Sequence, residues 1–151
     1  MRRKTNPNNQ ISLDDFPKSI SRSFIISLSA NSLLDEVRYA SEEIASNTFL
    51  ENSFRQLKWI SGQLDELEEY LSDIFDIYPD HPYRLRIVSL FREIPQHIEK
   101  TQSALVGMRL SSISDLNIDP DNTRLDVHLY NLNGTLTNLY SSLKNLKIQN
   151  N

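Results

Sequence analysis

The stretch LDVHLYNLNGTLTNLYSSLKNL, residues 125–146, decides the fold class. Leucine recurs in it at intervals of four and three residues, at Leu125, Leu129, Leu132, Leu136, Leu139, Leu143 and Leu146. At about 3.6 residues per turn, this spacing gathers the leucines into one stripe along an α-helix. The stretch therefore predicts a helix, at about 121–148, that buries its leucine stripe.

Three earlier segments carry apolar residues at the same spacing, which predicts helices at about 18–46, 48–78 and 82–116. Their stripes are Ile26, Ala30, Leu33, Val37, Ala40, Ile44; Leu50, Leu57, Ile60, Leu64, Leu67, Leu71, Ile74, Tyr78; and Ile87, Phe91, Ile94, Ile98, Leu105, Met108. Ser53 and Thr101 are the polar members of the second and third stripes. This coiled-coil-like repeat in every segment indicates an all-α protein.

The breaks between the stripes contain residues that end and begin helices. Pro17 stands near the first start, Ser46-Asn47-Thr48 can cap the second helix, and YPDHPY and DLNIDPDN separate the remaining helices. Such short connections favour antiparallel neighbours. We therefore expect one up-down-up-down four-helix bundle over residues 17–149, preceded by a flexible polar arm at 1–16.

The composition of the chain indicates which partners it can bind and in which cellular compartment it occurs. The chain of 151 residues has no cysteine, a net charge of -4 and no apolar run near the roughly 20 residues that span a bilayer. The absence of cysteine excludes disulfides and thiolate sites and fits the cytoplasm, while the negative charge disfavours a broad phosphate-binding face. We expect a cytoplasmic protein with no membrane partner, and nucleic acid is a less favoured partner.

No motif for a metal or cofactor is present. A di-iron bundle needs two Glu-x-x-His repeats, and a zinc site without cysteine needs closely grouped histidines and carboxylates. The three histidines stand in separate segments without such spacing, and the three glycines stand alone rather than in a phosphate-binding loop: His81, His97, His128, Gly62, Gly107 and Gly134. We expect neither a metal nor a cofactor.

The segment FREIPQHIEK, residues 91–100, holds the favoured candidate catalytic pair, Arg92 and His97; RLDVHLY at 124–130 has one residue too few between arginine and histidine and carries less weight. An arginine followed after a few residues by a histidine in a small helical protein resembles the signature of HEPN-domain ribonucleases. The resemblance implies a metal-independent site in a dimer cleft. There His97 would act in acid–base cleavage of RNA, and Arg92 would stabilise charge on the phosphate.

Helix geometry separates these two side chains. Five positions on a regular helix turn them roughly 140° apart, on opposite flanks of the Phe91–Ile94–Ile98 seam. Pro95 removes a backbone hydrogen bond and is expected to bend the helix. Such a bend could bring Arg92 and His97 together, or it could only curve the helix around the core. We favour the curved helix without a catalytic pair.

Trp59 is the candidate partner-binding residue, because its register places it away from the second seam. Tryptophan is enriched at binding hot spots. The alternative is that the N-terminal segment covers it through Ile11, Leu13 and Phe16. Five carboxylates that also fall outside this seam predict a solvated acidic face: Asp65, Glu66, Glu69, Asp73 and Asp76.

The favoured interpretation is a non-catalytic accessory or adaptor protein that acts through protein–protein contacts, with another protein or with a second copy in a homodimer. The HEPN-like ribonuclease is the first alternative. The second is an accessory subunit of a nucleic-acid enzyme. In it, Arg84, Arg86 and the arm Arg2-Arg3-Lys4 would contact phosphates.

Overall fold

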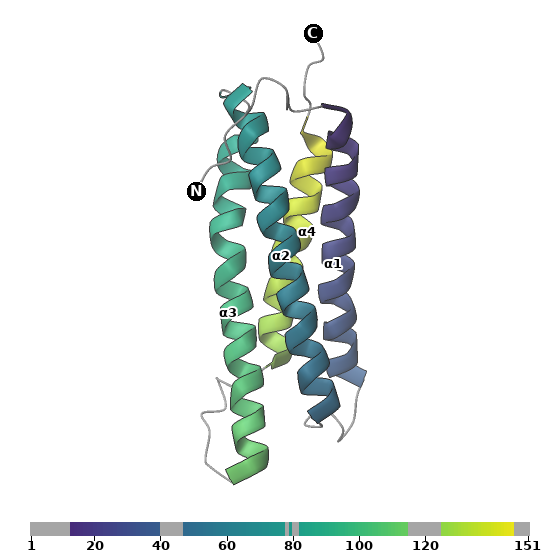
Figure 1. Cartoon of the computed structure of the whole chain (residues 1–151), viewed down its shortest axis with the longest axis vertical. Helices are drawn as coiled ribbons and strands as arrows, with labels where there is room; N and C mark the ends of the chain where they lie inside the picture. The colour runs from purple at the N-terminus through teal and green to yellow at the C-terminus, as the bar shows by residue number, and fades with distance from the viewer. Residues whose placement is uncertain (1–12, 40–46, 78, 80–81, 115–124, 147–151) are drawn as a thin grey trace.

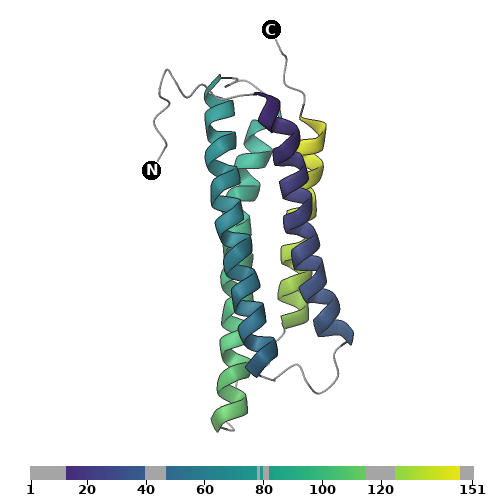
Figure 2. The same ribbon diagram turned by 45° about the vertical axis from the view of Figure 1, so that its right-hand side comes forward.

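The protein is an antiparallel bundle of four α-helices. The computed structural model describes residues 13–39, 47–77, 79, 82–114 and 125–146. A 3₁₀ turn, η1 (Leu13–Asp15), leads into α1 (Phe16–Tyr39), α2 (Asn47–Ile77), α3 (Arg84–Ser114) and α4 (Leu125–Asn145). The helices run side by side along one long axis, and the chain direction reverses from each helix to the next (Figures 1 and 2). The predicted all-α, up-down-up-down architecture is confirmed.

The order of neighbours around the bundle follows the chain. α1 packs against α2 and α4, and α3 packs against the same two helices. The start of α1, the end of α2, the start of α3 and the end of α4 lie at one end of the bundle, at the top of Figure 1. Across the described helices, no segment has both the length and the apolar character that crossing a bilayer requires.

The predicted stripes form the core. Every leucine of the α4 stripe is between 0 and 5 % exposed, and the described apolar members of the other stripes are buried except Val37, which is half-buried. The two polar members are buried as well, Ser53 at 3 % and Thr101 at 0 %. The Thr101 hydroxyl donates to the His97 carbonyl at 2.7 Å, so a polar group occupies the core without losing its hydrogen bond. Ala40, Ile44, Tyr78 and Met108 lie outside the side chains that the structure describes.

The helix bounds differ from the expected ones chiefly at the start of the chain. α1 begins at Phe16 rather than at 18, and Phe16 is a core residue at 9 % exposure rather than part of an arm. α2 begins one residue before its expected start, and α3 begins two residues after its own; the expected end of α2, residue 78, is outside the described residues. Residues 40–46, 115–124 and 147–151, where the other expected ends fall, lie outside the described residues.

Asp73 corrects the prediction of a wholly solvated acidic face on α2. It is 2 % exposed, whereas Asp65, Glu66, Glu69 and Asp76 are exposed as expected. α1 packs against α2, and contacts between the two helices reach this flank. Glu66, one heptad before Asp73, pairs with Arg22 of α1 at 3.2 Å. Burial, followed by the charge of Asp15 just before α1, raises the pKa of Tyr70 in α2 to about 12.

Candidate interaction surface between α1 and α2

Three apolar side chains lie exposed together where α1 meets α2. Ile25 and Leu28 of α1 are 53 % and 48 % exposed, and Trp59 of α2 is 43 % exposed. Ile25 and Leu28 are three residues apart, which places them on the same side of α1, off the Ile26–Ala30 seam. The outward position predicted for Trp59 is confirmed. Phe16 packs in the core, Ile11 lies outside the described residues, and so does the side chain of Leu13.

Two hollows meet at Ile25 and Trp59, which line both of them. The upper hollow, towards the start of α1, is otherwise lined by Pro17, Lys18, Ser21, Arg22 and Gln63. The lower hollow is otherwise lined by Leu28, Ser29, Ser32, Glu36, Asn52, Arg55 and Gln56. We call Ile25, Leu28, Trp59 and these two hollows the Trp59 surface.

Polar contacts hold α1 and α2 together beneath this surface. The Gln56 side-chain amide donates to both the carbonyl and the hydroxyl of Ser29, at 3.1 and 2.8 Å. Arg22 donates to the Glu66 carboxylate at 3.2 Å at the other end. A surface tied across both helices is preorganised, so little conformational freedom remains to be lost when a partner binds.

Nearby Phe24 does not belong to the Trp59 surface, although it is 43 % exposed. Its ring lies 5.1 Å from the Tyr140 ring of α4, centroid to centroid. The Lys144 ammonium lies 6.0 Å from the Tyr140 centroid. Phe24 therefore packs towards α4, whereas Ile25 and Leu28 turn towards α2.

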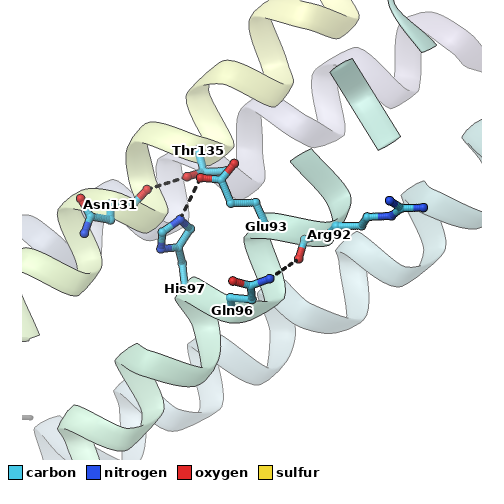
Figure 3. Close-up of polar contacts among 6 residues, drawn as sticks. All are labelled: Arg92, Glu93, Gln96, His97, Asn131 and Thr135. Carbon is cyan, nitrogen blue, oxygen red and sulfur yellow. Dashed lines mark hydrogen bonds and ion pairs between the residues drawn. The ribbon is translucent and has the colours of Figure 1, made fainter. Parts of the chain in front are cut away.

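Arg92 and His97 are not brought together within one chain. Nε2 of His97 lies 3.2 Å from Oε1 of Glu93, and the helix continues unbroken through Pro95. Figure 3 shows His97 and Glu93 on the α4 side of α3, while the Arg92 guanidinium extends away from them. The Gln96 amide donates to the Arg92 carbonyl at 3.4 Å. Pro95 thus leaves the two side chains on different flanks.

Arg84 and Arg86 point to different surroundings. Arg84 donates to the Pro79 carbonyl at 2.9 Å, in a hollow between α2 and α3 that is also lined by Asp65, Glu68, Glu69 and Asp76. Arg86 donates through Nε to the buried Ser142 hydroxyl of α4 at 3.0 Å. The carboxylates around Arg84 repel a phosphate, and Arg86 links α3 to α4. Arg2, Arg3 and Lys4 lie outside the described residues.

The hollow between α2 and α3 is acidic. Partial burial, followed by the nearby charge of Asp65, raises the pKa of Glu68 above its ordinary value. Among the described residues, no three histidines or carboxylates are grouped so that they would hold a metal ion. The described lining of this hollow therefore offers negative charge without a group of three metal-ligating side chains.

Comparison with known proteins adds no relative: no protein-family model, no curated protein and no solved structure matches this chain. Sequence reasoning found Trp59 but missed Ile25 and Leu28. The sequence did indicate that both are exposed, because they are large apolar residues of the first helix that fall outside its stripe. Their significance depends on Trp59 lying opposite them, which only the packing of α1 on α2 establishes.

Proposed function

We propose that the protein is a non-catalytic helical accessory or adaptor protein that binds a helical partner through the Trp59 surface. The observation that carries this proposal is the grouping of Ile25, Leu28 and Trp59, each about half-exposed, beside two hollows. Apolar anchors at the centre of a polar rim are typical of protein–protein interfaces.

The surroundings of the three apolar residues support the same proposal. Charged and polar side chains surround them, among them Arg22, Glu36 and Arg55. The groove between two packed helices suits a third helix, whose apolar side chains fit between those of α1 and α2. A helical partner would bury the tryptophan and leave the rim charges near water.

Photo-crosslinking tests this proposal. With p-benzoylphenylalanine at position 28 in the native host, irradiation should give a covalent adduct with one identifiable protein. The same group at position 92, an exposed site on α3, should not give that adduct. Purified Trp59→Ala should bind the identified partner at least about tenfold more weakly, which corresponds to about 1.4 kcal/mol.

A stability control separates an interface role from a core role. Trp59→Ala should lower the free energy of unfolding by less than about 2 kcal/mol, because the side chain already meets water. Ile60→Ala, at the fully buried next position, should cost about 2–5 kcal/mol. If Trp59→Ala costs as much as Ile60→Ala in urea denaturation, or if no adduct forms at position 28, the proposal fails.

A further inference from the structure

We propose that the partner on the Trp59 surface is a second copy of this chain, packed antiparallel about a two-fold axis that passes close to Trp59. This inference rests on the proposed function, since it names the occupant of the same surface. It starts from a second regularity on α1.

The side of α1 that borders α2 carries a second stripe, formed by Lys18, Arg22, Ile25, Ser29, Ser32 and Glu36. The intervals alternate between four and three residues, so these side chains follow one line along about 27 Å of helix at 1.5 Å per residue. Every member lines one of the two hollows, and all but Ser29 are exposed. A continuous line of this kind is the geometry with which one helix packs along another.

The stripe has opposite charges at its two ends. It begins with Lys18 and Arg22, has Ile25 near its middle, and ends with Glu36. A two-fold axis perpendicular to α1 at the middle of the stripe exchanges the two ends. Lys18 of each copy then faces Glu36 of the other, and the two Ile25 side chains lie near the axis.

The contacts between α1 and α2 place Trp59 at about the same level as this axis. Gln56 bonds to Ser29 just below the middle of the stripe, and Glu66 bonds to Arg22 above it. Trp59 lies between Gln56 and Glu66 on α2. The same operation therefore brings the two Trp59 side chains towards each other at the centre, where two-fold interfaces place their apolar anchors.

Self-complementarity favours a second copy over an unrelated partner. Within the stripe, cations lie at one end, a carboxylate at the other and Ile25 between them, so the stripe matches itself when it is reversed. On the same copy, Lys18 also pairs with Asp15 and Arg22 with Glu66, and Arg55 lines the hollow of Glu36. A contact strip about 10 Å wide and about 27 Å long covers roughly 270 Å² on each copy, which is below the usual size of stable specific interfaces. We therefore expect a weak, reversible dimer whose affinity falls with salt.

Charge exchange between two variants tests this arrangement with the full chain. In sedimentation equilibrium at low salt, the wild-type mass should rise with concentration from 17.5 kDa towards twice that value. Lys18→Glu and Glu36→Lys should each associate at least about tenfold more weakly, because each homodimer contains two like-charge contacts. An equimolar mixture should recover wild-type association within about threefold, since both contacts are then between opposite charges.

The controls separate association from folding. Each substitution places its new charge at the end of α1 where the helix dipole favours it, so α1 should remain folded by circular dichroism. Arg92→Glu, on the exposed side of α3, should associate as the wild type does. Emission from the single tryptophan should shift to shorter wavelength as dimer forms.

Two results would overturn the antiparallel dimer: a wild-type mass of 17.5 kDa at every concentration, or a mixture no tighter than either variant alone. If either occurs while position 28 still crosslinks to a different protein in a Trp59-dependent way, the proposed function stands without the dimer. If position 28 forms no adduct as well, both proposals fail.

Discussion

Nε2 of His97 lies 3.2 Å from Oε1 of Glu93, one helical turn earlier on α3, and this contact draws the imidazole towards α4 (Figure 3). Residues four apart lie on the same side of a helix, so the Glu93 carboxylate can accept a hydrogen bond from Nε2 of His97 when that nitrogen carries the proton. The histidine thus has a structural partner, while Arg92 extends from another side of the helix. Within one chain, the pair has no common substrate position.

The first prediction follows from this divergence. Purified protein should not cleave single-stranded RNA in the presence of EDTA above the rate of a buffer blank, and His97→Ala should not change that rate. Gel analysis of a labelled RNA measures both. Metal-independent cleavage that disappears in both Arg92→Ala and His97→Ala, with the fold retained, would instead establish the HEPN-like alternative.

The heptad spacing predicted the core of each helix because it reports which side of a helix is apolar, a property local to that helix. It correctly placed Ser53 and Thr101 in buried positions although both are polar. It could not predict the burial of Asp73. That burial depends on how neighbouring elements pack against α2, and the spacing within α2 contains no information about its neighbours.

For the candidate site, too, the sequence predicted the features that lie within one helix but not those that depend on two helices. Trp59 was recognised because its register within α2 is outward. Its association with Ile25 depends on the height at which α1 packs along α2, and contacts such as Gln56 to Ser29 set that height. The divergence of Arg92 and His97 agreed with regular helix geometry, because Pro95 left the helix continuous.

The second prediction concerns the Ser53 hydroxyl, which is buried and finds no hydrogen-bond partner within the described part of the chain. Ser53→Ala removes an unsatisfied polar group and inserts a better helix former, so it should stabilise the protein by about 1 kcal/mol. A thermal melt should show a rise in Tm of about 2–4 °C.

Ser142→Ala is the matched control for Ser53→Ala, because Ser142 is equally buried at 3 % but accepts a hydrogen bond from Arg86. Losing that bond should destabilise the protein by about 0.5–1.5 kcal/mol. Opposite signs for the two Ser→Ala changes support this account. A loss of stability in Ser53→Ala would show that its hydroxyl is satisfied.

The third prediction concerns two glycines inside helices, Gly62 of α2 and Gly134 of α4. Both are exposed, and a Cβ added at either would meet no atom of the described residues within 4 Å beyond its own helix backbone. Alanine should therefore stabilise each helix by about 0.5–1 kcal/mol through reduced backbone entropy in the unfolded chain. Urea denaturation of both single variants and the double variant measures the gains, which should add. Ala104→Gly, in the core of α3, should show the opposite sign, and a destabilising Gly62→Ala or Gly134→Ala would contradict the prediction.

The last prediction uses the pKa of Glu68, which burial and then the charge of Asp65 raise above the ordinary value. A raised pKa means that the ionised carboxylate is less favourable in the folded chain than in the unfolded chain. Glu68→Gln should therefore stabilise the protein at about pH 7, by no more than about 0.5 kcal/mol because solvent screens a surface group. The gain should shrink as the pH falls through the raised pKa and vanish at about pH 3, where both states carry a protonated Glu68.

Thermal melts at about pH 7 and about pH 3 measure this gain in stability, with Glu51→Gln as a control for removing one negative charge from a chain of net charge -4. A gain no larger than that of Glu51→Gln at about pH 7, or one that persists at about pH 3, would show that the hollow between α2 and α3 does not destabilise the Glu68 carboxylate.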